Sequence, residues 1–375
     1  MEPGPDMRRL SVTPRADAEQ KLDAIGLAWA YESDCWNESF CYEFTEAQII
    51  EIETATNELH AMCLQAARYI VDHKLYRSLG IREDAVPLIE RSWNSKDPSL
   101  YGRFDLLYNG VDPPKMLEYN ADTPTALVEA SVAQWQWLAD LYPHADQFNS
   151  LHESLVDRWK QIAPSLPQGR VDFCSLDNFE DGVTAGYLLE TARQAGLAVN
   201  TYPVAEIGWN RNGFFVDPAN QPITAMFKLY PWEWMVREEF GKHLFPSTTK
   251  WIEPPWKMLL SNKGILAILW KLFPNSPYLV EARLDAPPFH FGWVRKPLLS
   301  REGGNISVHG GPPTEGPYGV EGFVWQRFVE PPVFDGRYPV VGSWIVGGAA
   351  HGMGIRESTT PVTDNRSPFI PHYFI

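Results

Sequence analysis

The chain has 375 residues, 44% of them hydrophobic and 21% charged, which is typical of a globular protein with room for two or three subdomains. Its formal net charge of −15 argues against a general nucleic-acid-binding protein, because phosphate backbones need clustered Lys and Arg. No apolar run reaches the length of a membrane span, and the N-terminal segment lacks the apolar core of a secretory signal, so we expect a cytoplasmic protein without membrane contact.

The N-terminal part of the chain is predicted to be a flexible tip followed by a long helix. Residues 1–20 are polar and contain proline, which predicts mobility. From Thr45, the segment TEAQIIEIETATNELHAMCLQAARYIVDHK carries apolar residues at helical spacing. Thr45 and Gln48 open it in a capping-box arrangement. The helix is expected to be structural.

The four cysteines have neither CxxC spacing nor the density of a disulfide scaffold. They are Cys35, Cys41, Cys63 and Cys174. We therefore expect core or incidental thiols and propose no metal site from them.

The stretch RFDLLYNGVDPPKMLEYNADTP is predicted to form two strands joined by the turn-rich NGVDPP. We expect Tyr108 to pair with Lys115. That register places four polar side chains on one face in opposed pairs: Asp105 with Glu118, and Arg103 with Asn120. A slip of one residue would send the two carboxylates to opposite faces.

The oxygen atoms of Asp105, Glu118 and Asn120 suit Mg²⁺, particularly when phosphates complete the coordination. Two neighbouring carboxylates repel each other unless a cation or Arg103 compensates. A solvent-facing strand pair with an Arg–Asp salt bridge is an equally good interpretation of the spacing alone.

A helix is predicted to begin directly after this hairpin. Thr123 would be its N-cap and Pro124 its first helical residue. The hairpin would then bring a helix N-terminus, which favours carboxylates and phosphates, beside the polar cluster. Thr123 and Thr125 are candidates for substrate contacts, although capping alone explains each of them.

A strand–helix–strand pattern follows in VDFCSL, DGVTAGYLLETARQAG and LAVNTYPV, which predicts a parallel pair with a helical crossover. The turn DNFED lies at the carboxyl end of the first strand, where open α/β sheets place ligand crevices. Glu180 and Asp181 could receive an amine there. Acidic residues in this position more often complement the helix dipole.

The C-terminal third combines lysines in apolar segments with a polar glycine loop. Lys263 lies in the predicted helix KMLLSNKGILAILWKLF, and Lys296 and Gln326 lie in the predicted strands GWVRKPLL and GFVWQRFV. Between these strands, residues 300–305 read SREGGN. Lysine charge and glycine amides together indicate a triphosphate cradle. The loop lacks the GxxxxGK[ST] pattern of a P-loop, and an isolated strand lysine is more often an edge or snorkelling residue.

Near the end of the chain, YPVVGSWIVGGAAHGMGIRES is predicted to form two strands around Gly347–Gly348. With RFDLLYN…PKMLEYNADTPTALVEA, NKGILAILW and VRKPLLSREGGNI, its WIVGGAAHGMGIRES resembles the glutathionylspermidine synthase family, in its synthetase-only form. The resemblance runs from about Trp29 to the C-terminus. Bifunctional members also carry an amidase domain, for which 375 residues leave no room, so no hydrolase activity is expected.

The resemblance implies an α/β (α+β) fold of the ATP-grasp type, with a preATP-grasp-type βαβ lobe and an antiparallel-sheet ATP lobe. The implied parts are a flexible N-terminus (1–20), a segment with the N-terminal helix, the metal-binding hairpin and the βαβ lobe (21–250), a lid and nucleotide lobe (251–340), and a C-terminal hairpin and tail (341–375).

The resemblance also implies roles for individual residues. Asp105, Glu118 and Asn120 would hold Mg²⁺ on the ATP phosphates, and Arg103 would contact the transferred phosphate. The ATP-binding residues would be Lys263, Lys296, Gln326 at the adenine, and Ser300, Gly303 and Gly304 in a lid over the triphosphate. Substrate contacts would come from Thr123, Thr125, Glu180, Asp181 and Asp364.

These expectations lead to an ATP- and Mg²⁺-dependent carboxylate–amine ligase that works through an acyl phosphate. A peptide-like acid, with glutathione as a candidate, and an amine, with polyamines as candidates, are the expected substrates. A kinase-like phosphoryl transferase and a catalytically silent nucleotide-binding relative are the alternatives. The sequence leaves the oligomeric state open.

Overall fold

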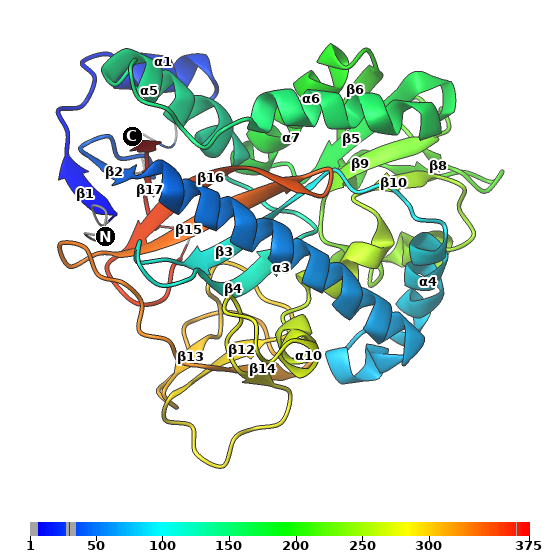
Figure 1. Cartoon of the computed structure of the whole chain (residues 1–375). Helices are drawn as coiled ribbons and strands as arrows, with labels where there is room; N and C mark the ends of the chain where they lie inside the picture. Colours follow the sequence, from blue (N-terminus) through cyan, green and yellow to red (C-terminus); the bar gives the residue numbers. More distant parts are fainter. Residues whose placement is uncertain (1–6, 28–29, 31–34, 365) are drawn as a thin grey trace.

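The computed structural model describes residues 7–27, 30, 35–364 and 366–375. Three larger sheets organise this part of the chain: a central antiparallel sheet, a parallel sheet covered by helices, and an antiparallel sheet that forms the lobe at the bottom of Figure 1. This mixed architecture is the expected α/β (α+β) fold, with both of the expected lobes.

The central sheet joins segments far apart in the sequence. Its order is β17-β16-β15-β3-β4, and all its neighbours are antiparallel. The strands are β3 (Tyr101–Leu107), β4 (Lys115–Asn120), β15 (Tyr338–Val346), β16 (Ala349–Ser358) and β17 (Phe369–Ile370). Figure 1 shows the orange and red C-terminal strands directly beside the cyan hairpin β3–β4. The predicted C-terminal strand pair around Gly347–Gly348 is confirmed.

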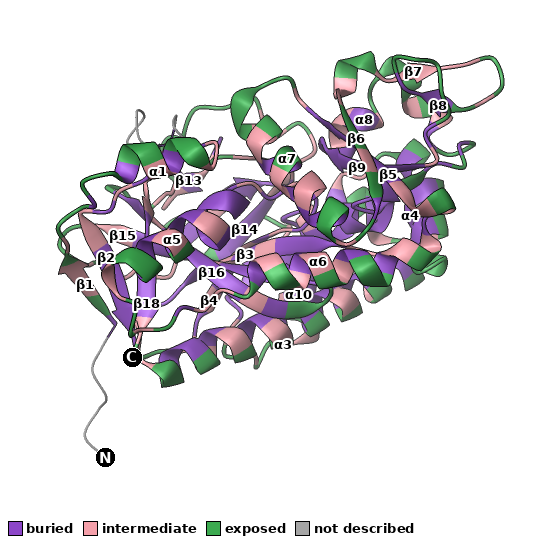
Figure 2. Cartoon of the chain, turned by 90° about the horizontal axis from the view of Figure 1, so that it is seen from above, coloured by how far each residue is buried: buried purple, intermediate pink, exposed green. Residues whose placement is uncertain are grey.

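The long N-terminal helix is confirmed as α3 (Glu46–Asp72), with its predicted cap. The Thr45 hydroxyl accepts a hydrogen bond from Gln48 N at 3.3 Å, and the Gln48 side chain accepts one from Thr45 N at 2.9 Å. The apolar face of α3 packs on β15 and β16, and Figure 1 shows the helix crossing the sheet. In Figure 2 the central strands are largely purple, whereas the outer helices are green on their outer sides. The helix therefore closes one face of the sheet.

The predicted parallel βαβ unit is also confirmed, within a sheet of order β10-β9-β5-β6. Its strands are β5 (Arg170–Ser175), β6 (Ala198–Pro203), β9 (Ala225–Leu229) and β10 (Lys250–Ile252). The crossover helix α7 (Phe179–Gln194) packs beside α6 (Leu151–Ile162) over this sheet. A small hairpin, β7 (Gly208–Trp209) with β8 (Phe215–Val216), leads into β9.

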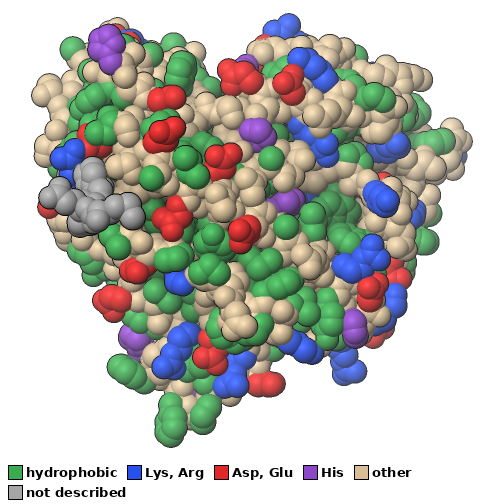
Figure 3. Space-filling model, in the orientation of Figure 1, with side chains coloured by type: hydrophobic (Ala, Val, Ile, Leu, Met, Phe, Trp, Pro, Cys, Tyr) green, Lys and Arg blue, Asp and Glu red, His purple; other side chains and the backbone are tan. Residues whose placement is uncertain are grey.

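The third sheet has the order β11-β14-β12-β13 and is antiparallel. Its strands are β11 (Ala282–Arg283), β12 (Trp293–Pro297), β13 (Ser307–Val308) and β14 (Phe323–Arg327), and α10 (Ile265–Leu272) packs against β11 and β14. On the face shown in Figure 3, hydrophobic side chains protrude from the lower tip, over this lobe.

The single helix predicted around Lys263 is wrong. The segment forms two helices, α9 (Met258–Ser261) and α10, separated at Asn262–Gly264. Asn262 is extended, its side-chain oxygen accepts from Gly264 N, and its amide donates to Leu79 O, both at 2.8 Å. These bonds replace the helical ones, so Lys263 lies in the turn between the helices.

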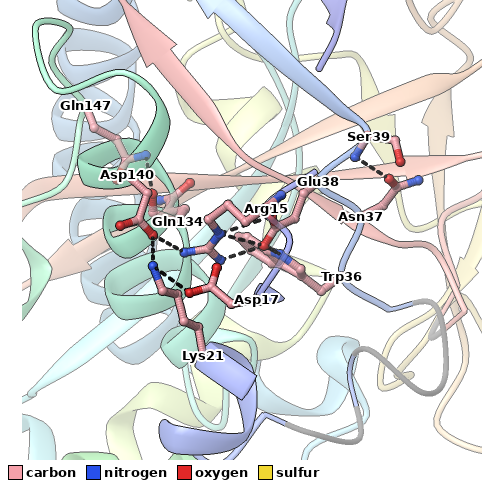
Figure 4. Close-up of polar contacts among 10 residues, drawn as sticks. All are labelled: Arg15, Asp17, Lys21, Trp36, Asn37, Glu38, Ser39, Gln134, Asp140 and Gln147. Atoms are coloured by element: carbon pink, nitrogen blue, oxygen red, sulfur yellow. Dashed lines mark hydrogen bonds and ion pairs between the residues drawn. The ribbon is translucent and has the colours of Figure 1, made fainter. Parts of the chain in front are cut away.

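Residues 1–20 are predicted to be flexible; residues 1–6 lie outside the described residues, and a paired strand begins at Arg8. β1 (Arg8–Ser11) pairs with β2 (Phe40–Phe44), which pairs with the C-terminal strand β18 (His372–Phe374). Figure 4 shows the contact that fixes the following segment: the buried Arg15 guanidinium contacts the Glu38 carboxylate and, at 2.8 Å, Asp140. Composition alone did not reveal this charge-assisted pairing.

The predicted part boundaries do not follow the sheets. The boundary after residue 250 falls inside β10, whose Lys250 pairs with Ala225 of β9. The boundary after residue 340 falls inside β15. Boundaries drawn in chain order miss these pairings because strands distant in the sequence share sheets.

The other α-helices lie in the described part of the chain outside these packing contacts. They are α1 (Ala18–Ala24), α4 (Val86–Asn94), α5 (Gln134–Leu141) and α8 (Trp232–Met235). All four cysteines are buried free thiols, as expected. Among the described residues, none of the helices is long and apolar enough to cross a membrane.

The capping box gives a stability test for α3. Thr45→Ala removes the acceptor for Gln48 N, so we expect the free energy of unfolding to fall by about 1 kcal/mol. Thr45→Ser keeps the hydroxyl and is the matched control, expected near wild type. Urea unfolding followed by circular dichroism would measure both; equal stability of the Ala and Ser variants would contradict a role for the cap.

Candidate active site

The face of the β3–β4 hairpin carries the predicted polar cluster. Asp105 pairs with Glu118 and Arg103 with Asn120, as predicted. The predicted Tyr108–Lys115 pair is wrong, because the register shifts after Asp105 and Lys115 pairs with Leu107. The shift leaves residue 117 of β4 without a partner, as in a β-bulge. The bulge lies between the turn and the cluster, so it changes the turn without separating the carboxylates.

The four side chains form one connected group. Arg103 Nε donates to Asp105 Oδ1 at 2.7 Å, and Asn120 Nδ2 lies 3.2 Å from Asp105 Oδ2 and 3.1 Å from Glu118 Oε1. On the neighbouring strand β15, Gly342 pairs with Asp105. A Cβ at Gly342 would lie 2.9 Å from Arg103 Cδ, so glycine makes room for the arginine to lie across the sheet.

Lys263 joins this cluster from the turn between α9 and α10. Its ammonium lies 3.0 Å from Glu118 Oε2 and 2.9 Å from Ser300 O. Lys263 is therefore the link between the carboxylate cluster and the glycine loop.

Lys296 lies on β12, and its side chain contacts the bulge of β4. Its ammonium donates to Leu117 O at 3.0 Å and to the side-chain oxygen of Gln326 at 2.7 Å. Burial lowers the pKa of Lys296 to about 8, although the charge of Glu118 opposes this shift. Burial alone would raise the pKa of Glu118, but the charges of Lys263 and Lys296 outweigh it and hold that pKa below its usual range.

Two cavities meet at these side chains. The smaller, about 120 Å³, lies between the third sheet and the central sheet. It combines apolar walls, among them Val280, Val294, Val308 and Phe328, with the polar groups of Lys296 and Gln326. The larger, about 630 Å³, lies between the hairpin and the parallel sheet. Both are lined by Asp105, Glu118, Lys263 and the loop residues Ser300 to Gly303.

Both acidic side chains and arginines line the larger cavity. Glu180 and Asp181 lie in the first turn of α7, where the Asn178 side chain accepts from Asp181 N at 2.9 Å. Burial raises the pKa of both carboxyl groups. Because burial disfavours an isolated negative charge, a cation would be stabilised beside them. Arg301 and Arg356 supply positive charge to the same cavity.

The helix predicted to start at Thr123 begins instead at Leu127, and residues 121–126 form a loop along the larger cavity, named here the substrate loop. Pro124 O accepts from the Tyr101 hydroxyl at 3.0 Å, and Thr125 O accepts from Arg103 at 2.7 Å. Ala126 has a left-handed φ of 70°. These contacts bind carbonyls that a helix would have used, so Thr123 is not a helix cap.

The glycine loop is only partly placed as predicted. Gly303 lines both cavities, and at its φ of 69° a Cβ would lie 2.7 Å from Thr363 O. Gly304 packs against Tyr318, and the Asp364 carboxylate binds Arg366. Of the predicted residues within the described chain, these two, Gly304 and Asp364, line neither cavity.

Sequence reasoning missed two functional candidates. Arg301 of the glycine loop lines both cavities and donates to the Thr123 hydroxyl. Lys228 forms a buried ion pair with Asp122 of the substrate loop. The sequence contained a hint of both residues. Arg301 lies between Ser300 and Gly303 of the glycine loop, and Lys228 is the only charged residue in the apolar run AMFKL.

The predicted Mg²⁺ ligands are two carboxylates and one amide. Among the described residues there is no group of three His, Cys, Asp or Glu side chains that could hold a metal ion. Asn120 Nδ2 donates to both the Asp105 and the Glu118 carboxylates, so the Asn120 oxygen would face an ion between the two carboxylates once the amide group has turned over. This set fits Mg²⁺ when phosphate oxygens and water complete the coordination.

Comparisons with known proteins show the family and the fold of the chain. The family model described as "Glutathionylspermidine synthase preATP-grasp" matches residues 9–375. A Haemophilus influenzae protein named "Putative acid--amine ligase" is 42% identical over 98% of this chain and 100% of its own length.

Two longer relatives are also similar. Trypanothione synthetase of Crithidia fasciculata is 27% identical over 83% of this chain, and the bifunctional glutathionylspermidine synthetase/amidase of Escherichia coli is 26% identical over 88%. The matched regions make up 53% and 58% of those two proteins. Among solved structures, a glutathione synthetase-like effector from Globodera pallida has a TM-score of 0.57 at 10% identity, covering 97% of this chain and 98% of its own, which shows the shared fold.

Lys296 gives a pH test of nucleotide binding. With its pKa lowered to about 8 by burial, the ammonium loses its proton as the pH rises through that value. Phosphates need the charged form, so we expect the affinity for Mg·ATP to fall as the pH rises above about 8, by up to about tenfold per pH unit. Calorimetric titration at several pH values would measure it.

Lys296→Arg is the control, because arginine stays charged over the whole range. We expect this variant to bind Mg·ATP with an affinity that does not change with pH. Parallel pH profiles for the variant and the wild type would show that another group controls binding.

Proposed function

The chain belongs to the glutathionylspermidine synthase preATP-grasp family, and on this premise we propose that it is an ATP- and Mg²⁺-dependent ligase that joins a carboxylate to an amine. One observation carries the proposal. Two cavities of different character meet at a continuous chain of contacts from Arg103 through Asp105, Asn120 and Glu118 to Lys263. Phosphoryl transfer needs such concentrated positive charge and oxygen ligands at one point.

The smaller cavity is the proposed ATP site. Its apolar walls suit the adenine ring, and Gln326 can hydrogen-bond it. Lys296 and Lys263 would then meet the phosphates, with Ser300 and Gly303 covering them. Asp105, Glu118 and Asn120 would hold Mg²⁺, which would neutralise phosphate charge during the transfer.

The larger cavity is the proposed site of the acid and the amine. Arg103 and Arg301 would bind the reacting carboxylate, and Thr123 and Thr125 would orient the acid. Glu180 and Asp181 would bind a positively charged part of the amine. A peptide-like acid and a polyamine suit these charges, and the names of the two longer relatives support both substrate classes.

The reaction then needs no nucleophilic side chain. A carboxylate oxygen of the acid attacks the γ-phosphorus of ATP, the bond to the bridging oxygen breaks, and ADP leaves. The amine nitrogen attacks the carbonyl carbon of the acyl phosphate, phosphate leaves with the C–O electron pair, and the nitrogen loses a proton. Arg103 neutralises charge on the phosphate, and the glycine loop keeps water from the acyl phosphate.

The test is ADP release with Mg·ATP across pairs of acids and amines, including glutathione, short peptides and polyamines, with mass detection of condensed products. We expect ADP and an amide to appear together for one pair only. ADP formed without any amine requirement would favour a kinase-like phosphoryl transferase. Mg·ATP binding without turnover for every pair would favour a catalytically silent relative. A cytoplasmic location stays a prediction.

Asp105→Asn tests the proposed Mg²⁺ ligands. The change keeps the size of the side chain but removes a charge from the metal set, so we expect turnover to fall by more than about 100-fold. Asp112→Asn, at the exposed turn of the same hairpin, is the control and should keep wild-type turnover. The melting temperatures of both variants should stay close to wild type. Wild-type turnover of the Asp105→Asn variant would contradict the assignment of Asp105 as a Mg²⁺ ligand.

A further inference from the structure

A buried ion pair joins the parallel sheet to the substrate loop. Lys228, on β9, is fully buried, and its ammonium lies 2.5 Å from Asp122 Oδ1. Asp122 is 3% exposed, and its other oxygen accepts from Trp232 N at 3.0 Å. The ammonium also lies 4.8 Å from the centre of the Trp232 ring. Both carboxylate oxygens of Asp122 are therefore bound by the segment 228–232.

Asp122 occupies a sensitive place in the chain. It follows Asn120 by two residues, precedes Thr123 and itself lines the larger cavity. Asn120 contacts the two cluster carboxylates, and Thr123 accepts a hydrogen bond from Arg301 of the glycine loop. A displacement of Asp122 would therefore move one contact on each side of the proposed reaction centre.

The rest of the substrate loop is held in the same way, by contacts from outside it. Tyr101 and Arg103 bind the carbonyls of Pro124 and Thr125. Ala126, with its left-handed φ of 70°, is 7% exposed. A non-glycine residue keeps such a conformation only when its surroundings impose it. The conformation of the loop thus depends on a few tertiary contacts. The Lys228–Asp122 ion pair is the contact that holds its N-terminal end.

A second buried pair in the protein allows a comparison. Lys257 lies 3.0 Å from Glu253, and both side chains are at most 1% exposed. Glu253 accepts from Leu100 N and Tyr101 N, at 2.9 and 2.8 Å, so this pair supports the start of β3. Within the described chain, neither residue lines the two cavities. Burial and charge are matched, but the pair of Lys228 contacts the substrate loop directly, through Asp122, whereas the pair of Lys257 reaches it only through Tyr101.

We propose that Lys228 is a positioning residue of the active site, which acts through Asp122 to fix the substrate loop. A buried ion pair adds little net stability, because desolvation offsets most of the attraction. Its consequence here is geometric: it sets where Asn120 and Thr123 stand relative to the phosphates and the acid. The catalytic part of this inference rests on the proposed function.

The experiment compares Lys228→Met with Lys257→Met. Each change keeps an unbranched stem and removes one buried charge, so both should lower the melting temperature. Hydrogen exchange of the peptide that covers residues 121–126 should increase more in Lys228→Met than in Lys257→Met. In the ligation assay, kcat of Lys228→Met should fall about 100-fold, as a displacement of about 1 Å can produce. Its KM for ATP should stay within about twofold of wild type, and Lys257→Met, whose pair reaches the loop only through Tyr101, should lose much less kcat than Lys228→Met.

The results separate this inference from the proposed function. A wild-type protein that forms no amide would contradict the proposed function, while the exchange measurement would still test the loop. Unchanged exchange in Lys228→Met, or equal loss of kcat in both variants, would overturn the positioning role. If Lys228→Met does not fold, the double variant Lys228→Met with Asp122→Asn removes both charges. Low kcat in the folded double variant supports the proposal, and wild-type kcat overturns it.

Discussion

The site depends on the register of β3, which is paired on both sides. β4 places Glu118 opposite Asp105, and β15 places Gly342 on the other side of the same residue. In a strand, a slip of one residue would turn the carboxylate to the opposite face. Because β3 pairs with a strand on each edge, two sets of backbone contacts fix the position of Asp105. The site also depends on the bulge at residue 117, because Leu117 O accepts a hydrogen bond from Lys296 there.

Charge balance in the cluster follows from this geometry. Two carboxylates would repel each other in a buried site, but Arg103 contacts one and Lys263 the other. In the proposed complex, Mg²⁺ would take over the carboxylates and the phosphates would take over the lysines. The same side chains would then exchange partners, and no buried charge would be left without a counter-ion at either stage.

Local patterns predicted the elements well, and tertiary contacts explain where they failed. The period of apolar residues and the Thr45 cap identified α3, and alternation identified the hairpin that carries Asp105 and Glu118. The strand–helix–strand pattern identified the parallel unit, the apolar segments around Lys263 and Lys296 singled out the lysines, and the resemblance added the ATP-grasp fold type. Local sequence did not reveal that Asn262 would interrupt a helix by bonding to Leu79, or that Arg103 would bind Thr125 O and prevent a helix start at Thr123. Each of these contacts joins residues far apart in the sequence. Asp364 lines neither cavity, and its carboxylate binds the nearby Arg366.

The position of β15 within the central sheet has a consequence for synthesis of the protein. β3 and β4 are made early, but β15, the strand that separates them from β16 and that pairs with Asp105, comes from residues 338–346. On the ribosome, the parallel sheet and α7 can assemble first, since domains form as their segments emerge. The polar face of the β3–β4 hairpin has to wait, with one edge of β3 unpaired, until nearly the whole chain has left the exit tunnel. A nascent chain would therefore carry an open strand edge, an ordinary site of unwanted strand pairing, for much of its synthesis, and the Glu118 carboxylate beside it would lack its partner until Lys263 is made.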